Sequence, residues 1–266
     1  MSPAKEKYNL RAEKINSLVC VGLDSDFQKL PEQFKSLEFP QFEFNKWIIE
    51  ETLEFAAAFK CNIAFYEARG EQGIHELKMT MGYLREKHSE VFTICDAKRA
   101  DIGNTNNGYA ESIFDYFGFD AITLHPYLGK EALNPFLDRQ DKVSIILCRT
   151  SNPGAGELQD LTVDGKPVWQ ILAEKVSKEW NVNHNCMLVV GATYPEEMKV
   201  VRSIVGEMTF LVPGIGAQGG DAQDAVRAGV NAQKLGMIIN SSRGIIFSEN
   251  PKAEAKKLRN EINKYR

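Results

Sequence analysis

Short runs of β-branched and apolar residues alternate along the chain with longer segments whose apolar positions have helical spacing. The short runs predict eight strands, at residues 18–23, 58–65, 91–95, 121–124, 143–147, 187–190, 209–212 and 234–239. The longer segments predict helices that include residues 44–55, 73–87, 107–117, 168–180, 195–205 and 221–228. This alternation predicts parallel strands joined by right-handed crossovers.

The predicted strands are continuously apolar, which indicates burial on both faces of the sheet. A (β/α)8 TIM barrel wrapped in helices provides that burial. We therefore expect an α/β fold in which residues 1–266 form one barrel domain, since no linker or low-complexity stretch interrupts the chain. An open doubly wound sheet is the alternative, but the turn GLDSDF after the first strand lacks the GxGxxG pattern of a dinucleotide site.

Composition and charge argue against two classes of binding partner, nucleic acids and membranes. The formal net charge of -4 leaves no surplus of Lys and Arg for binding nucleic acid. No apolar stretch reaches the roughly 18 residues of a membrane-spanning helix, and the N-terminal residues are charged and polar. We therefore expect a cytoplasmic protein with neither a nucleic-acid nor a membrane partner. The five cysteines have no metal-ligand spacing, which predicts reduced thiols in the core.

The chemistry of a barrel lies at the C-terminal ends of its strands, and the segment ICDAKRADIGNTN after the third strand is the most specific signal there. Asp96 and Lys98 should alternate onto one side of an extended segment, and Asp101 follows at the turn. If Lys60 joins them, two cations and two anions alternate, and no net charge need be desolvated. The neighbouring carboxylates would keep Lys98 protonated. The alternative is a solvated turn with ordinary ion pairs.

A glycine-rich turn, VPGIGAQGGD, follows the seventh strand and leads into a helix. Glycines allow backbone N–H groups to approach an anion near a helix N-terminus. Arg243 follows the eighth strand, and the loops after strands seven and eight are the usual phosphate site of this fold. Together they predict a phosphate site. The segment SNPGAGELQDLTVDGKP after the fifth strand predicts a lid or a substrate-facing insertion.

Seven segments, taken in order, carry a resemblance to one family. The chain resembles orotidine 5'-phosphate decarboxylase, in its bacterial branch with longer loops, over nearly its whole length. The matching segments are VGLDSD, AAFKCNIAFYE, DAKRADIGNTN, TLHPYLG, CRTSNPG, VPGIGAQGGD and NSSRG. The resemblance implies an enzyme that converts orotidine 5'-monophosphate into UMP, the last step of de novo pyrimidine synthesis, with neither a metal nor a cofactor.

The resemblance also implies a role for each charged residue at the barrel mouth. Asp24 would bind ribose hydroxyls, and Lys60 would link the ribose to the reacting centre. Asp96 would lie against the scissile carboxylate, and Lys98 would protonate C6. Loss of CO2 leaves a carbanion at C6 with no carbonyl placed to delocalise it. The Lys98 ammonium would therefore stabilise the developing charge before it delivers its proton.

Five further residues complete the implied site. Asp101 and Thr105 would reach across the interface of a homodimer into the partner's site. Ser151 would contact the amide edge of the pyrimidine, and Gln218 and Arg243 would hold the phosphate. The phosphate contacts would drive loop closure over the base, so that binding energy far from C6 would assist the reaction.

Three other functions fit parts of the same pattern. Related phosphosugar decarboxylases and aldolases share the DxKxxD motif but use Mg2+. They carry a carboxylate ligand where this chain has Lys60, and a lysine would repel the ion. A Schiff-base aldolase would need a lysine of lowered pKa, which the flanking aspartates oppose. A non-catalytic barrel that binds a phosphorylated ligand would hold four charged groups in one mouth without using them.

Overall fold

Eight parallel strands form a closed barrel in the computed structural model, which describes residues 2–215 and 220–266. Around the barrel the order is β1, β10, β9, β8, β5, β4, β3 and β2. The prediction of a (β/α)8 barrel is therefore confirmed, and the open doubly wound sheet is excluded. The barrel strands are β1 Val19–Gly22, β2 Ala56–Asn62, β3 Phe92–Arg99, β4 Ala121–Leu124, β5 Val143–Arg149, β8 Cys186–Val190, β9 Phe210–Val212 and β10 Met237–Ser241.

Parallel pairing on both sides of β1 closes the ring. Val19 lies opposite Ile239 of β10, and Cys20 lies opposite Ala58 of β2. β1, β4, β8 and β9 are buried at every position, as their continuously apolar sequences predicted. All five cysteines are buried and free, which agrees with the prediction of core thiols.

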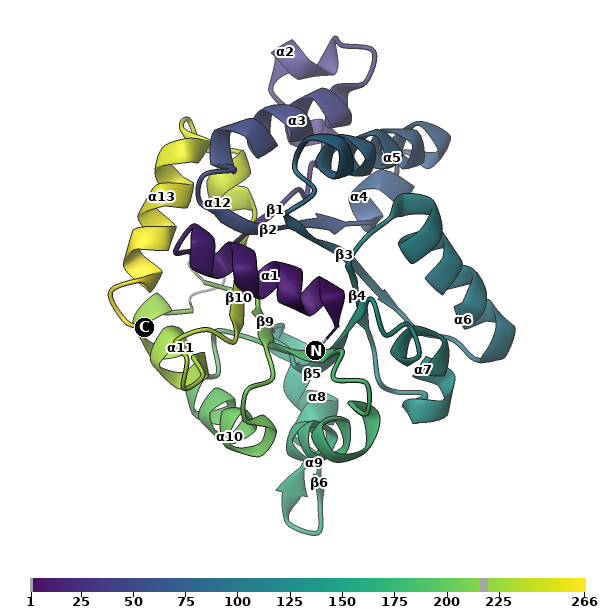
Figure 1. Ribbon diagram of the computed structural model, residues 1–266, viewed down its shortest axis with the longest axis vertical. Helices are drawn as coiled ribbons and strands as arrows, with labels where there is room; N and C mark the ends of the chain where they lie inside the picture. The colour runs from purple at the N-terminus through teal and green to yellow at the C-terminus, as the bar shows by residue number, and fades with distance from the viewer. Residues whose placement is uncertain (1, 216–219) are drawn as a thin grey trace.

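A ring of helices covers the outside of the barrel (Figure 1). No helix in the described parts of the chain has the length and apolar character needed to cross a membrane. The covering elements are α2 Glu32–Lys35, α3 Pro40–Thr52, α4 Ala64–Glu67, α5 Gly70–Lys87, α6 Gly103–Ala110, the π-helix η2 Glu111–Phe117, α7 Gly129–Leu137, α9 Val168–Lys175, the π-helix η4 Val176–Trp180, α10 Pro195–Val205, α11 Ala222–Gly229, α12 Arg243–Ile246 and α13 Pro251–Ile262; the short 3-10 helix η1 spans Phe27–Lys29.

The helix α1 (Pro3–Lys14) lies across one end of the barrel (Figure 1). The Tyr8 hydroxyl donates a hydrogen bond to the carbonyl of Met237, where β10 begins. The Nε of Arg11 donates to the carbonyl of Ala56, where β2 begins, at 2.9 Å. Because both contacts are made to strand starts, α1 closes the N-terminal end and leaves the C-terminal end of the barrel for the site.

The insertion after β5 has short elements of its own. The 3-10 helix η3 (Pro153–Ala155) and α8 (Gly156–Gln159) lead to an antiparallel hairpin of β6 (Thr162–Val163) and β7 (Lys166–Pro167), which projects from the body of the molecule in Figure 1. The side chain of Arg149, which ends β5, is 3 % exposed, and its Nη2 lies 3.2 Å from an oxygen of Asp160. Its guanidinium also lies over the ring of Tyr194, 3.8 Å from the centroid. Arg149 therefore anchors the base of the insertion.

Several strand boundaries differ from the prediction, and two of the differences have a local cause. The second strand ends at Asn62, and the apolar residues that follow it form α4 instead of extending the strand. The N–H of Ala64 donates to the side-chain oxygen of Asn62 at 3.2 Å, which fixes this turn. The last strand begins at Met237, three residues later than predicted, because Lys234 adopts a φ of +59° that an extended strand excludes.

Candidate active site

Strand ends and loops enclose a cavity of about 490 Å³ at the C-terminal end of the barrel. Polar side chains of β2, β3, β4 and β10, of the turns after β1 and β10, and of the insertion after β5 face it. Parallel strands all end at this mouth, so residues far apart in the sequence meet there. Six of the predicted site residues line the cavity: Asp24, Lys60, Asp96, Lys98, Ser151 and Arg243.

Lys60 lies at the centre of a charge cluster inside this cavity. Its side chain is 5 % exposed, and its Nζ lies 2.9 Å from Oδ2 of Asp96 and 3.6 Å from Oδ1 of Asp24. The three side chains come from β2, β3 and the end of β1, which are neighbours in the barrel. The N–H of Asn62 also donates to Oδ1 of Asp24 at 3.3 Å. Two carboxylates therefore compensate one buried ammonium that would be costly alone.

Asp96 receives donors on both oxygens of its carboxylate. Oδ2 pairs with Lys60, whereas Oδ1 lies 2.5 Å from the Nζ of Lys98. The hydroxyl of Thr123 also donates to Oδ1, at 2.9 Å. The Lys98 side chain is 51 % exposed, so its ammonium faces the open part of the cavity. Charges therefore alternate in the order Asp24, Lys60, Asp96 and Lys98.

The charge cluster shifts the pKa values of its buried members in opposite directions. Burial alone would lower the pKa of Lys60, but the carboxylates of Asp24 and Asp96 outweigh it and raise that pKa well above the usual value. Burial alone would raise the pKa of Asp96, but Lys60 and Lys98 outweigh it and hold that pKa well below the usual value. Both groups are thus charged at neutral pH. Among the described residues, no group of three or more His, Cys, Asp or Glu side chains could hold a metal ion.

The backbone at Lys98 is not extended, although the alternation of Asp96 and Lys98 predicted that it would be. Its φ is +47°, in the left-handed region that residues other than glycine rarely adopt. The pairing of β3 with β4 shifts register between Cys95 and Arg99, so that Lys98 lies in an irregular stretch. The predicted strand thus continues to Arg99 but is irregular at Lys98, and both side chains line one cavity.

Asp101 and Thr105 are not among the described residues that line the cavity. Asp101 is half-buried, and its N–H donates to the side-chain oxygen of Asn106 at 2.8 Å. Thr105 is exposed on α6. Next to Asp101 in the chain, the apolar Ile102 is 61 % exposed. Within one chain, Asp24 and not Asp101 is therefore the second carboxylate beside Lys60.

The other predicted contacts belong to loops around the cavity. Ser151 follows β5 and packs against Gly191 at the end of β8, where an added Cβ would come within 2.7 Å of the Ser151 Cβ. A larger residue than glycine at position 191 would displace Ser151. Arg243 begins α12, directly after β10, and is exposed. Gln218 lies outside the described residues.

A family model described as the Orotidine 5'-phosphate decarboxylase / HUMPS family matches residues 17–258. The chain belongs to this family. It is 44% identical over 257 residues to "Orotidine 5'-phosphate decarboxylase" of Cellvibrio japonicus, with 93% of each chain covered. It is 43% identical over 268 residues to the protein of the same name from Janthinobacterium sp., with 98% of each covered.

Solved structures agree with this family assignment. The OMP decarboxylase of Leishmania donovani superposes with a TM-score of 0.89 at 38% identity, covering 100% of this chain and 98% of that one. The UMP synthase of the same organism superposes with a TM-score of 0.90 at 40% identity, covering 99% of this chain and 56% of that longer one. The likeness therefore extends over the whole barrel.

Several polar residues line this cavity although no role in the site was predicted for them. Nothing in the sequence indicated that Gln159 belongs to the site, because Gln159 comes ten residues after β5 ends. Only the folding of the insertion brings it back to the C-terminal end of the barrel. Its Oε1 accepts the N–H of Thr150 at 2.9 Å, and its Nε2 donates to the Thr150 hydroxyl at 2.8 Å. The other polar residues lie within or just after the apolar strand ends, so their positions could have been noticed in the sequence. The set is Asn62, Thr123, Thr150, Asn152, Gln159, Asn240, Ser241 and Ser242.

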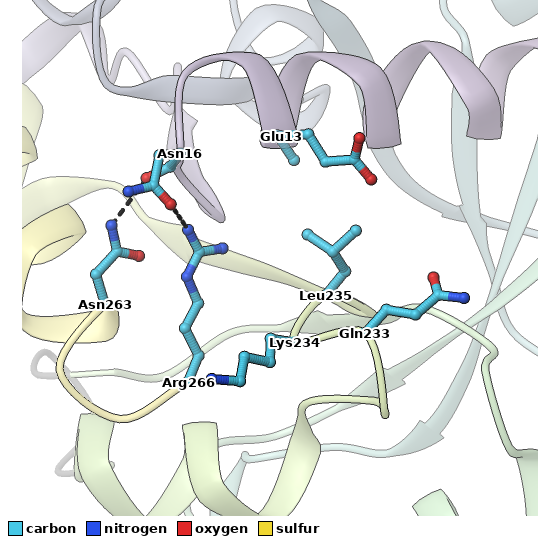
Figure 2. Close-up of a pocket in the computed structure, with 8 residues that line it drawn as sticks. Glu13, Asn16, Gln233, Lys234, Leu235, Asn263 and Arg266 are labelled. Carbon is cyan, nitrogen blue, oxygen red and sulfur yellow. Dashed lines mark hydrogen bonds between the residues drawn. The ribbon is translucent and has the colours of Figure 1, made fainter.

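A second hollow, of about 500 Å³, lies near the opposite end of the barrel. Figure 2 shows Asn263 and Arg266 reaching toward Asn16, with the Nδ2 of Asn263 donating to the Asn16 carbonyl at 2.9 Å. Its lining residues come before β1, before β10 or from the end of the chain, and none is a predicted site residue. Barrels carry their chemistry at the C-terminal mouth, so the candidate site of this family member is the first cavity.

Proposed function

We propose that the protein decarboxylates orotidine 5'-monophosphate to UMP without a metal or a cofactor. The observation that carries the proposal is the ammonium of Lys60 held between Asp24 and Asp96, next to the Lys98–Asp96 pair. Family membership alone leaves phosphosugar chemistry open, but the curated relatives at 43% to 44% identity are named orotidine 5'-phosphate decarboxylase. Lys60 stands where the magnesium-dependent alternative would need a carboxylate.

The proposed reaction uses the alternating charges directly. The substrate carboxylate at C6 would lie against Asp96, and their repulsion would fall as neutral CO2 leaves. The electron pair of the broken C–C bond would remain at C6, where the Lys98 ammonium stabilises it. Lys98 would then transfer a proton to C6 and complete UMP. Lys60 would keep Asp96 ionised and in place throughout.

The remaining contacts would bind the nucleotide away from the reacting carbon. Asp24 would accept hydrogen bonds from ribose hydroxyls, and Ser151 would contact the pyrimidine amide edge. Arg243 and Gln218 would hold the phosphate. Arg243 and Lys98 line one cavity, which supports a substrate that spans both positions. Binding energy from the phosphate can then help to fix the base and exclude water.

We also propose a homodimer in which Asp101 and Thr105 complete the partner's site. The positions of these residues outside the cavity lining, with the exposed apolar Ile102 between them in the sequence, support a contact between subunits. The proposal treats residues 1–266 as a single decarboxylase domain. It also includes a cytoplasmic location, because five free cysteines are typical of a reducing compartment.

An ultraviolet absorbance assay with orotidine 5'-phosphate tests the function. We expect decarboxylation at the same rate with and without EDTA. Activity only on a phosphosugar, with a strict requirement for Mg2+, would show that the protein is a magnesium-dependent phosphosugar enzyme instead. Loss of activity on borohydride treatment with substrate, with a covalent adduct on Lys60 or Lys98, would indicate a Schiff-base enzyme. Binding without turnover would leave a non-catalytic barrel.

A further inference from the structure

One threonine hydroxyl bridges Asp96 and Lys98 of β3. The Oγ1 of Thr123, on the neighbouring strand β4, accepts the N–H of Lys98 at 3.0 Å and lies 2.9 Å from Oδ1 of Asp96. Thr123 is only 1 % exposed, so water cannot readily replace either bond.

The direction of both hydrogen bonds is fixed by chemistry. A backbone N–H can only donate, so the Thr123 oxygen accepts from Lys98. The ionised Asp96 carboxylate can only accept, so the single hydroxyl proton of Thr123 points to it. Oδ1 of Asp96 then has the Thr123 hydroxyl and the Lys98 ammonium as donors, while Oδ2 has Lys60. With donors on both oxygens, the carboxylate has little freedom to rotate.

The strand pairing explains why a side chain is needed here. Cys95 pairs with Ile122 and Arg99 pairs with Leu124, so three residues of β3 face a single residue of β4, which is Thr123. The three residues bulge out of the ladder, and Lys98 takes its φ of +47° within that bulge. A strained conformation of this kind persists only where surrounding contacts hold it.

We propose that Thr123 is a positioning residue that holds the Asp96 carboxylate and the Lys98 backbone as one unit. It acts through those two residues and is not itself catalytic. Without its hydroxyl, the Lys98 N–H and one acceptor site of Asp96 lose their partner, and only the ion pair then holds the ammonium relative to the carboxylate. The proposal rests on the decarboxylase function proposed above.

The same strand offers a matched control at its other end. The hydroxyl of Thr93, at the start of β3, donates to Oδ2 of Asp120 at 2.9 Å and accepts the N–H of Asp120 at 3.1 Å. Thr93 is 4 % exposed, so it resembles Thr123 in chemistry and burial. It lies at the N-terminal end of the barrel and does not line the cavity.

The test compares Thr123→Val, Thr123→Ala, Thr123→Ser and Thr93→Val by steady-state kinetics, UMP binding and thermal unfolding. We expect Thr123→Val and Thr123→Ala to lower kcat roughly 10- to 100-fold, as for loss of a buried hydrogen bond. UMP has no C6 carboxylate, so its Kd should stay within about threefold of wild type. The acid limb of the pH profile should move to higher pH, because Asp96 has lost a donor. Thr123→Ser keeps the hydroxyl and should recover most of kcat.

Thr93→Val should lose stability without a comparable loss of kcat. The proposal is overturned if both hydroxyl-free variants at position 123 keep kcat within about threefold of wild type, or if Thr93→Val loses as much kcat as they do. A wild-type protein that turns over no orotidine 5'-phosphate would overturn the proposed function and this inference together. If the wild type is active and the position-123 variants keep its kcat, only the inference about Thr123 is overturned.

Discussion

The Nζ of Lys60 lies 2.9 Å from Oδ2 of Asp96, and the two side chains are only 5 % and 13 % exposed. Each charge is therefore buried in a site that is favourable only because the other is present. Removal of the lysine would leave the carboxylates of Asp24 and Asp96 without the cation that separates them. The stability of the barrel mouth and its chemistry thus depend on the same atoms.

We expect Lys60→Met to lower the free energy of unfolding by about 3–5 kcal/mol, because it leaves buried carboxylates uncompensated. Urea denaturation at neutral pH measures this loss. Lys35→Met is the control, since Lys35 pairs with Glu32, whose side chain is 87 % exposed, and should cost less than about 1 kcal/mol. Equal losses in the two variants would contradict the role of burial.

The acid dependence of stability should report on Asp96. Its pKa is lowered in the folded protein by Lys60 and Lys98, which outweigh burial, so the folded state binds a proton less readily than the unfolded state. The stabilisation is present above the unfolded value of about 4 and is lost as pH falls below it. Urea denaturation between neutral and strongly acidic pH should show this loss, and Asp96→Asn should flatten it. Asp164→Asn, at the turn of the β6–β7 hairpin, should keep the wild-type slope; an unchanged slope in Asp96→Asn would refute the assignment.

Lys98→Ala should abolish turnover without loss of the fold. The variant removes the proposed proton donor and the ammonium that would stabilise the charge at C6, so we expect kcat to fall by at least ~10³-fold. Its melting temperature should stay close to wild type, because the Lys98 side chain is 51 % exposed. Lys234→Ala, in the hollow of Figure 2, is the control and should keep full activity. Wild-type decarboxylation by Lys98→Ala would remove Lys98 as the donor.

Mixing two inactive variants tests whether the subunits share their active sites. If Asp101 acts in the partner's site, inactive Lys98→Ala and Asp101→Ala chains should form heterodimers with one intact site, and an equal mixture should recover about a quarter of wild-type activity. Lys98→Ala mixed with Lys60→Ala should recover none, because Lys60 and Lys98 meet within one chain through Asp96. Heterodimers that form without recovering activity in the first mixture would place Asp101 in its own chain's site.

The fold could be predicted from the alternation of apolar runs and helical segments along the chain. Continuous apolar runs separated by helical segments have few arrangements that bury every strand on both faces, and the closed barrel is one of them. The same pattern misplaced the end of the second strand. Residues 63–65 are apolar, and a short apolar run does not distinguish a buried strand from a buried helical turn. The bond from Ala64 to the Asn62 side chain decided that the chain turns there.

Part of the candidate site could likewise be predicted from the sequence, and part depends on the tertiary structure. The sequence by itself determined the charged residues at the strand ends, because parallel strands deliver whatever follows them to one mouth. Only the tertiary structure decided which charges touch. Asp24 lies beside Lys60, Lys98 takes a left-handed backbone against Thr123, and Gln159 returns to Thr150 through the folded insertion. These relationships depend on the register between neighbouring strands and on contacts across loops, which are properties of packing in three dimensions and leave no periodic trace along the chain.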